Sequence, residues 1–327
     1  MPKYYAALAH ERFQPDDLLT QAGDAELAGF DGVCCSDHLA PWWTDATAPT
    51  ASGNAWVWLG AAARETKRCD LGSAVTAIVH RYNPVVVAQQ IATLELLAPG
   101  RGFLGVGSGE AMNEVPAGFD WPSPEEQLAR TEEALTIITR LLDGETVDYH
   151  GRFFKTKGAV LYSKPKRRPP VYLSAFHEGA AELAGRLADG LWTLGDPRKA
   201  PKLIKAYRDA WAREPFVLLQ AVFSYAADED KALEAAREWK GTQVDRHYTD
   251  DVRDPAEIYR NGEDEVPDAL FTKQVICSAD PQTHVTRIKA IEKLGADVVV
   301  LMNVSGADPH AALRVYGERV IPKLKSG

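Results

Sequence analysis

The sequence lacks the features that mark membrane, secreted and disulfide-stabilised proteins. No stretch approaches the ~18 consecutive apolar residues that a membrane-spanning helix needs. The first residues, MPKYYAALAHERF, reach Glu11 and Arg12 without the apolar core of a secretory signal. The chain has only four cysteines, and none belongs to a C-x-x-C pair. We therefore expect a cytoplasmic protein without membrane association, whose cysteines are structural free thiols.

Positive charge, clustered histidines and nucleophile motifs are also scarce. Lys and Arg total 37 against 46 Asp and Glu, which gives a formal net charge of −9. Such a field repels phosphate backbones, so we expect no nucleic-acid partner. The eight histidines show no H-x-x-x-H or H-x-H spacing, so no metal site is predicted. No GK[ST] follows a glycine-rich loop and no G-x-S-x-G occurs, which excludes P-loop enzymes and the common serine hydrolases.

Short apolar runs alternate with segments of helical periodicity along the whole chain. Eight runs have consecutive apolar positions, as expected of parallel strands buried on both faces. They are residues 4–9, 31–36, 71–78, 102–107, 171–175, 191–194, 217–225 and 296–303. Nine helices are predicted between and after them, at 15–28, 55–65, 85–97, 124–142, 180–188, 201–212, 231–240, 281–294 and 309–324; many begin at a proline or a capping residue.

This alternation predicts an α/β fold, a (β/α)8 TIM barrel, because a doubly wound sheet usually needs fewer strands. The chain is expected to form one domain over residues 1–327, with two insertions. Residues near 144–168 have the pattern of a β-hairpin, and residues 241–272 are polar and poorly periodic.

Polar clusters follow three of the predicted strands, where a TIM barrel places its active site. Ser36-Asp37-His38 follows the second strand, Ser108-Gly109-Glu110 follows the fourth, and His10-Glu11 follows the first. Each cluster alone could be a helix cap or a tight turn. An imidazole and two carboxylates at one barrel mouth are an arrangement for general acid and base catalysis. Trp42-Trp43 is expected to form an exposed aromatic wall of the pocket, whereas Trp56 and Trp58 are expected in the core.

Three motifs together resemble the luciferase-like TIM-barrel oxidoreductases, in the branch that uses the deazaflavin coenzyme F420. They are S-D-H-x-x-P-W at 36–42, HRYNPVVVAQQIATLELLAPGR at 80–101 and LGVGSGEAMNE at 104–114. The pattern is most similar to F420-dependent secondary-alcohol dehydrogenases and next to F420-dependent glucose-6-phosphate dehydrogenases. The resemblance implies hydride transfer between a hydroxyl compound and F420, with a homodimer as the assembly. It runs from about residue 3 to residue 325.

The resemblance also implies roles for individual residues. His38 would take the substrate hydroxyl proton, Trp42 would stabilise the alkoxide-like transition state, and Glu110 would exchange a proton with the deazaflavin. Glu11 falls where the family has a carboxylate near the histidine, and Ala74–Val75 falls at a non-proline cis peptide. The implied cofactor-binding residues are Asp37, Ala74, Thr76, Ala77, Ser108, Gly109, Asn113, Phe176, His177, Gly179 and Ala180.

Two departures from the family pattern bear on the substrate and on the cofactor. The cationic residues that hold the sugar phosphate in the glucose-6-phosphate enzymes fall on Pro197, Thr249 and Gln274, which disfavours a phosphorylated substrate. The loop for the cofactor phosphate reads Ala-Phe-His-Glu-Gly-Ala at 175–180, and Glu178 there is unfavourable for an anion. A sugar or sugar-6-phosphate dehydrogenase, an FMN-dependent luciferase-like monooxygenase and an F420 carrier without catalysis are the alternatives.

Overall fold

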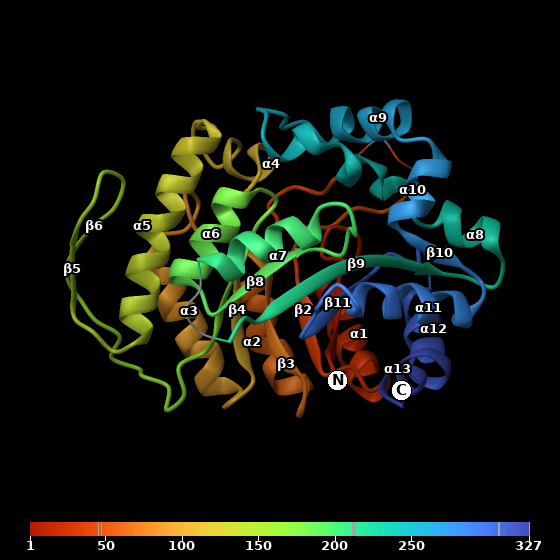
Figure 1. The fold of residues 1–327 in the computed structure, drawn as a ribbon, viewed down its shortest axis with the longest axis horizontal. Helices are drawn as coiled ribbons and strands as arrows, with labels where there is room; N and C mark the ends of the chain where they lie inside the picture. Colours follow the sequence, from red (N-terminus) through yellow and green to blue (C-terminus); the bar gives the residue numbers. More distant parts are fainter. Residues whose placement is uncertain (45, 47, 211–213, 307, 327) are drawn as a thin grey trace.

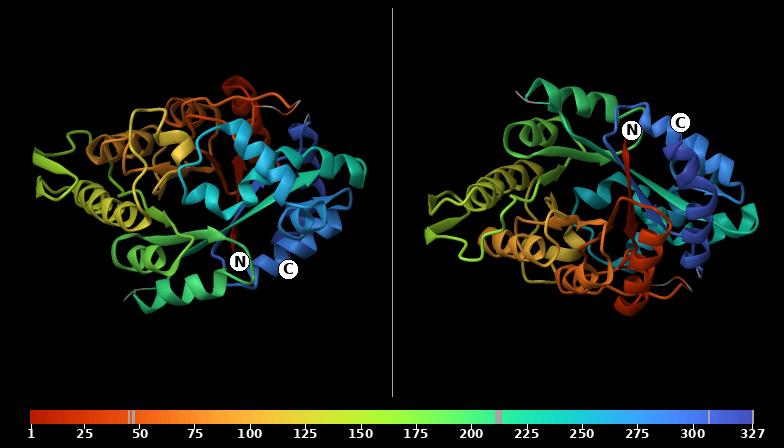
Figure 2. Two further views of the ribbon diagram at one scale, coloured as in Figure 1. Left: turned by 90° about the horizontal axis from the view of Figure 1, so that it is seen from above. Right: turned by 90° about the horizontal axis from the view of Figure 1, so that it is seen from below.

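Eight parallel strands close into a barrel surrounded by helices (Figures 1 and 2). The structure, a computed structural model, describes residues 1–44, 46, 48–210, 214–306 and 308–326. The barrel strands are β1 (Lys3–Leu8), β2 (Gly32–Cys35), β3 (Asp70–Ala77), β4 (Gly102–Gly107), β7 (Val171–Ser174), β8 (Gly190–Leu194), β9 (Val217–Tyr225) and β11 (Val298–Asn303). Each pairs with the next in this order, and β11 returns to β1. All eight predicted strands and the TIM-barrel fold are confirmed.

Prolines and polar caps set where most outer helices begin. These helices are α1 (Pro15–Leu27), α2 (Ala55–Glu65), α3 (Pro84–Leu97), α5 (Pro124–Leu142), α6 (Glu178–Leu187), α7 (Ala200–Asp209), α11 (Pro281–Glu292) and α12 (Pro309–Val315). Asn83, Ser123 and Asp280 each precede such a proline, and each accepts a backbone N–H of the first turn. The helix predicted to residue 212 ends at Asp209, and residues 211 and 212 lie outside the described residues.

Two predicted helices are not continuous. The segment predicted at 231–240 is α8 (Glu229–Glu234) followed by the 3-10 helix η1 (Arg237–Gln243). The segment predicted at 309–324 is α12, a π-helical turn η3 (Tyr316–Val320) and α13 (Ile321–Lys325). The second segment keeps one buried face throughout, which is why a single helical period described it. In η1 four consecutive residues, 238–241, are buried, so the first segment does not keep one helical face.

Aromatic side chains fill the lower interior of the barrel. Tyr5 and Phe103 stack with ring centroids 5.4 Å apart, and Phe103 also contacts Tyr172 and Trp192. A Cβ on Gly72 would lie 2.2 Å from the carbonyl oxygen of Phe103, so only glycine fits there. A cavity lies toward the carboxyl ends of the strands. Cys34, Cys35 and Cys69 are buried and all four cysteines are free, as expected.

The two insertions differ in how well the sequence predicted them. The first forms the expected antiparallel hairpin, β5 (Val147–His150) with β6 (Lys155–Ala159). The second is more structured than expected, with η2 (Asp245–Tyr248), α9 (Pro255–Glu265) and α10 (Asp268–Gln274) lying over the barrel mouth (Figure 1). A Cβ on Gly262 would lie 2.4 Å from the backbone nitrogen of Gly241, so glycines bring α9 and η1 together. Such backbone contact leaves little apolar periodicity to detect.

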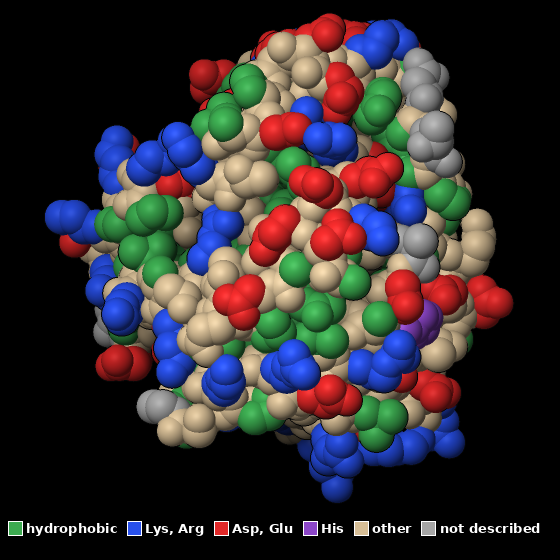
Figure 3. Space-filling model, turned by 90° about the vertical axis from the view of Figure 1, so that its right-hand side faces the viewer, with side chains coloured by type: hydrophobic (Ala, Val, Ile, Leu, Met, Phe, Trp, Pro, Cys, Tyr) green, Lys and Arg blue, Asp and Glu red, His purple; other side chains and the backbone are tan. Residues whose placement is uncertain are grey.

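Outside the second insertion, two further short elements were not predicted from the sequence. α4 (Ala111–Glu114) follows β4, and β10 (Ile276–Ser278) extends the sheet beside β9. None of the described helices is long and apolar enough to cross a membrane. On the face shown in Figure 3, acidic and basic side chains are interspersed rather than segregated.

Candidate active site

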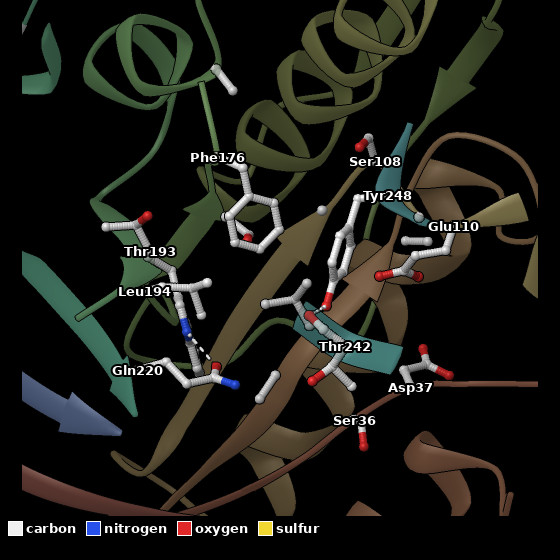
Figure 4. A pocket seen from close by; sticks show the side chains of 18 of the residues that line it. Ser36, Asp37, Ser108, Glu110, Phe176, Thr193, Leu194, Gln220, Thr242 and Tyr248 are labelled. Atoms are coloured by element: carbon white, nitrogen blue, oxygen red, sulfur yellow. Dashed lines mark hydrogen bonds between the residues drawn. The ribbon is translucent and has the colours of Figure 1, made fainter. Parts of the chain in front are cut away.

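A cavity of about 230 Å³ lies at the carboxyl ends of the barrel strands, beneath the second insertion (Figure 4). Most of the predicted site residues line it: Glu11, Asp37, His38, Trp42, Ala74, Ala77, Ser108, Gly109, Glu110, Phe176, His177 and Ala180. Thr76, Asn113 and Gly179 do not line it. The clusters that follow β1, β2 and β4 thus meet at one site.

His38 lies between two carboxylates. Its Nδ1 is 3.4 Å from Oε1 of Glu11, and its Nε2 is 4.0 Å from Oε2 of Glu110. The hydroxyl of Ser36 donates to the other oxygen of Glu11 at 2.8 Å. Glu11 is buried and His38 is largely shielded from solvent. The imidazole therefore has one nitrogen facing a held carboxylate and the other facing the cavity.

Asp37 is held by groups behind the cavity wall. Its Oδ2 accepts the hydroxyl of Thr76 at 2.8 Å, and its Oδ1 accepts that of Tyr82 at 3.1 Å. Arg81 lies 3.5 Å from Asp37 Oδ1 and also pairs with the buried Glu114. Burial raises the pKa of Glu114, an effect that Arg81 opposes. Thr76 thus positions Asp37 from behind.

Asn113 connects two parts of the site without reaching the cavity. Its Oδ1 accepts the backbone N–H groups of Leu39 and Ala40 at 2.8 and 3.1 Å. Its Nδ2 donates to Oε2 of Glu110 at 3.0 Å. The side chain is buried, and both polar atoms of its amide, Oδ1 and Nδ2, are hydrogen-bonded within the protein.

The expectation that Trp42 and Trp43 are exposed is wrong, since both are buried. Trp43 is fully buried and packs against Trp239 of η1, with ring centroids 4.9 Å apart, because the second insertion covers the loop after β2. Trp42 does line the cavity, between His38 at 5.4 Å and Tyr248 at 5.6 Å. Phe176 continues this row of rings, 5.4 Å from Tyr248 (Figure 4). Trp58 is buried as expected, whereas Trp56 is only partly buried.

Backbone features support the other side of the cavity. The Ala74–Val75 peptide is cis, as the resemblance implied, and the β3–β4 register shifts between Ser73 and Thr76. Nδ1 of His177 accepts the N–H of Ala180 at 3.3 Å and so caps α6. Glu178, in the same turn, forms an ion pair with Lys202 at 2.8 Å. The carboxylate that seemed unfavourable for an anion therefore has a cationic partner.

Several cavity residues were not identified from the sequence. They come from β8, β9, β11, η1 and the second insertion: Thr193, Leu194, Gln220, Val222, Trp239, Thr242, Gln243, Tyr248 and Met302. Thr249 also lines the cavity, at a position that the resemblance aligned with a phosphate-binding residue of the glucose-6-phosphate enzymes. Gln220 had a detectable signal, since it interrupts the apolar run of β9. Tyr248 had none, because its element was not predicted.

Comparison with known proteins identifies the family. A profile of the luciferase-like monooxygenase family matches residues 3–298. The chain belongs to this family. The resemblance inferred from S-D-H-x-x-P-W and its companion motifs is thereby confirmed.

Two similar proteins match this luciferase-like chain over almost its whole length. An F420-dependent glucose-6-phosphate dehydrogenase of Microbacterium testaceum (strain StLB037) is 39% identical over 325 residues, covering 96% of this chain and 95% of the relative. A solved F420-dependent secondary alcohol dehydrogenase, in complex with an F420-acetone adduct, is 32% identical with a TM-score of 0.92 and covers 99% of both chains. The coenzyme F420-dependent tetrahydromethanopterin reductase of Methanopyrus kandleri shares the fold, with a TM-score of 0.81 and 23% identity over 99% of both chains.

Proposed function

We propose that this chain is an F420-dependent dehydrogenase that moves a hydride between a secondary alcohol, or a related uncharged hydroxyl compound, and the deazaflavin. One arrangement carries the proposal. His38 lies between Glu11 and Glu110, and no Lys or Arg is among the described residues that line the cavity. The named relatives support the cofactor, since both the 39% and the 32% identical proteins are described as F420-dependent.

The residues on one side of the cavity fit a planar, anionic cofactor. Ala74, Val75, Ser108 and Gly109 offer a surface of small groups and backbone beside the hydroxyl of Ser108. The cavity wall at Gly107 is formed by backbone. A Cβ at this position would lie 2.9 Å from Val75, so a larger residue would not fit without a shift. The first turn of α6 offers backbone N–H groups for a phosphate. When bound, the deazaflavin supplies a two-electron hydride acceptor.

His38 is placed to take the substrate proton. Nε2 of His38, which faces the cavity, would accept the O–H proton as the alcohol becomes a carbonyl compound, and a deazaflavin bound beside it would supply the acceptor for the hydride. Glu11 faces the positive charge that this transfer creates, and Ser36 holds Glu11 in place. Glu110, held by Asn113 through a hydrogen bond to Oε2, lies on the opposite side of the imidazole, 4.0 Å from Nε2. Trp42 packs beside His38 and excludes water from this point.

The charges around the cavity favour an uncharged substrate. Glu11, Asp37 and Glu110 all line it, and a phosphate dianion needs cationic donors to enter such a field. Two nearby cations are engaged elsewhere: Arg198 pairs with Asp196 at 2.7 Å and Lys199 with Asp245 at 3.1 Å. Oxidation of glucose 6-phosphate, suggested by the name of the 39% identical relative, is the second candidate.

Fluorescence titration and steady-state kinetics test this function. We expect the purified protein to perturb F420 fluorescence on titration and to reduce F420 with isopropanol more efficiently than with glucose 6-phosphate. His38→Ala should lower the turnover rate about 10²- to 10⁴-fold while F420 binding is kept. His150→Ala, an exposed histidine on β5, is the matched control. A yellow, oxygen-consuming protein would instead indicate the FMN-dependent monooxygenase, and F420 binding without reduction by any hydroxyl compound would indicate a carrier.

We also propose that the chain forms a homodimer through α2 and α3. Val57 on α2 is 78% exposed, and Val86, Leu96 and Leu97 of α3 are also exposed. Beside them is a shallow hollow lined by Trp56, Gly60, Gln89, Gln90, Thr93, Leu94 and Leu97. A Cβ on Gly60 would meet nothing within 4 Å, so this face has room for a neighbouring chain. An exposed apolar patch is typical of a protein–protein interface, and a two-fold interface would use this patch on both chains.

A further inference from the structure

A buried ion pair joins the loop that carries Glu11 to a segment that covers the barrel mouth. Nη1 of Arg12, between β1 and α1, lies 2.8 Å from Oε1 of Glu238 in η1. The two side chains are only 11% and 8% exposed, so the pair is largely withdrawn from water. Within the described part of the chain, neither of them has a second ion-pair partner. We call η1 and η2 together, residues 237–248, the covering segment.

Each partner of the pair is a sequence neighbour of a residue that lines the cavity. Arg12 follows Glu11, whose Oε1 lies 3.4 Å from Nδ1 of His38. Glu238 precedes Trp239, which lines the cavity from the covering segment. The pair therefore ties the loop of the proposed catalytic carboxylate to an aromatic wall of the same cavity.

Apolar packing holds the covering segment against the barrel without fixing its position. Trp239 packs on Trp43, and the same buried cluster contains Ala9 of the loop after β1. Hydrophobic contact is non-directional, so such a surface permits sliding. A buried ion pair is different, because each charge without its partner would bear the full cost of desolvation. Only positions of the covering segment that keep Arg12 beside Glu238 are therefore favourable.

A second ion pair between the covering segment and the barrel lies in solvent. Lys199, after β8, pairs with Asp245 of η2 at 3.1 Å, and these side chains are 56% and 86% exposed. Water screens such a pair, so its contribution is small. The comparison assigns the positional constraint to the buried pair.

The two partners of the buried pair are not equivalent. Burial raises the pKa of Glu238 to about 7, and the charge of Arg12 opposes this effect. A carboxylate can take up a proton and become neutral, whereas a guanidinium stays charged in proteins. Loss of Arg12 therefore leaves a group that can be neutralised, but loss of Glu238 leaves a buried positive charge.

We propose that Arg12 and Glu238 form a positioning pair, which holds the covering segment at a fixed distance from the barrel rim and so sets the room available to the substrate. The inference rests on the proposed function and adds a positioning role at the same site. Substrate binding depends on the pair because Trp239 and Tyr248 line the cavity from the covering segment. F420 binding does not, because its proposed residues lie on or after β2, β3, β4 and β7.

A double-mutant cycle on the full chain separates positioning from stability. Arg12→Met, Glu238→Met and the double variant are compared with the parent in F420 reduction by isopropanol and cyclohexanol, in F420 fluorescence titration and in urea unfolding. Glu238→Met should lower the urea midpoint more than Arg12→Met, whereas the double variant, with no buried charge, should unfold close to the parent midpoint. All three variants should raise KM for the alcohols about tenfold, the double variant no more than the single ones, and leave kcat and F420 affinity within about threefold.

Hydrogen–deuterium exchange measures the covering segment without turnover. Backbone amides of residues 237–248 should exchange about tenfold faster in the double variant, while the barrel strands keep the parental rates. Asp245→Asn removes the exposed pair with Lys199 and is the matched control. Its KM and its exchange should stay within about twofold of the parent.

The other outcomes distinguish this inference from the proposed function. A double variant with parental KM and parental exchange would show that the pair acts only on stability, and would overturn the inference. Faster exchange over the whole chain would do the same, since it indicates global destabilisation. If isopropanol and cyclohexanol leave F420 oxidised in the parent, the proposed function fails instead, and the exchange of residues 237–248 still decides whether the pair holds the covering segment.

Discussion

Asn113 donates a hydrogen bond from its side-chain amide to Oε2 of Glu110 at 3.0 Å. The other end of the same amide accepts the backbone N–H groups of Leu39 and Ala40, directly after His38. A single buried side chain thus sets the distance between the loop that carries the imidazole and the carboxylate on its far side. Asn113 does not line the cavity, so we infer that it positions Glu110 and the loop after β2; its contact with the cofactor stays a prediction.

Substitutions at Asn113 should distinguish the effect of its amide oxygen from the effect of its amide nitrogen. Asn113→Asp keeps an acceptor for Leu39 and Ala40 but removes the donor to Glu110 and places a like charge beside it. We expect kcat to fall about tenfold, with F420 binding within threefold of the parent. Asn113→Ala removes both ends and leaves two N–H groups unpaired, so we expect it to lower the free energy of unfolding by about 2 kcal/mol. Equal kcat in the parent and Asn113→Asp would show that Glu110 needs no such support.

His10 should make the protein sensitive to acid. It is fully buried against the edge of Trp58, with ring centroids 4.8 Å apart, and burial lowers its pKa to about 4. In the unfolded chain the same histidine binds a proton with a pKa near 6.5. The free energy of unfolding is therefore unaffected by His10 above that pH and decreases as the pH falls from about 6.5 toward 4. Between pH 7.5 and pH 5 the loss is about 2 kcal/mol.

The measurement for His10 is the urea unfolding midpoint at the two pH values. His10→Leu should lack this part of the pH dependence, so that its stability relative to the parent improves at pH 5. The exposed His150→Leu on β5 serves as the control. An identical acid response in His10→Leu and the parent would contradict the prediction.

His310 should affect the pH dependence of stability in the direction opposite to His10. It joins α12 to α1 through Asp24 at 2.6 Å and Asp17 at 3.1 Å. Partial burial alone would lower its pKa, but the hydrogen bonds to the two carboxylates outweigh burial, so the pKa of His310 is raised. The resulting stabilisation is present below about pH 6.5 and is lost as pH rises through the raised pKa.

Thermal unfolding at pH 6 and pH 9 tests the His310 pair. We expect His310→Gln to destabilise the protein by about 1 kcal/mol at pH 6 and by much less at pH 9. His150→Gln should have no effect at either pH. A loss of the same size at both pH values would mean that His310 contributes by packing and not by charge.

The α2–α3 face should govern assembly. Val57→Glu places a charge in the proposed homodimer interface, and we expect it to shift the molar mass measured by light scattering from dimer toward monomer. Leu270→Glu makes the same kind of change on α10, which Figure 1 shows on another side of the barrel, and should leave the dimer intact. A monomeric parent protein, or a dimer that is unaffected by Val57→Glu, would refute this interface.

Much of the site was predictable because a parallel barrel obeys a positional rule. Strands buried on both faces produce uninterrupted apolar runs, such as those that became β4 and β11, and the residues that follow them must meet at one rim. His38, Glu11 and Glu110 were found in this way, each by its place after a strand. Prolines after Asn83, Ser123 and Asp280 located the helix starts because proline is pre-organised for the first turn.

Tertiary structure alone decided the rest. Local periodicity and residue type were enough to predict the eight strands, the family motifs and the scarcity of cations near the site. It could not place Tyr248 over the cavity or bury Trp43, because both depend on how the second insertion folds back through contacts between glycine backbones. Nor could it show that Asn113 is consumed inside the protein or that Trp192 orients Gln220. Those roles depend on hydrogen bonds between residues far apart in the sequence, from Leu39 and Ala40 to Asn113 and from Trp192 to Gln220.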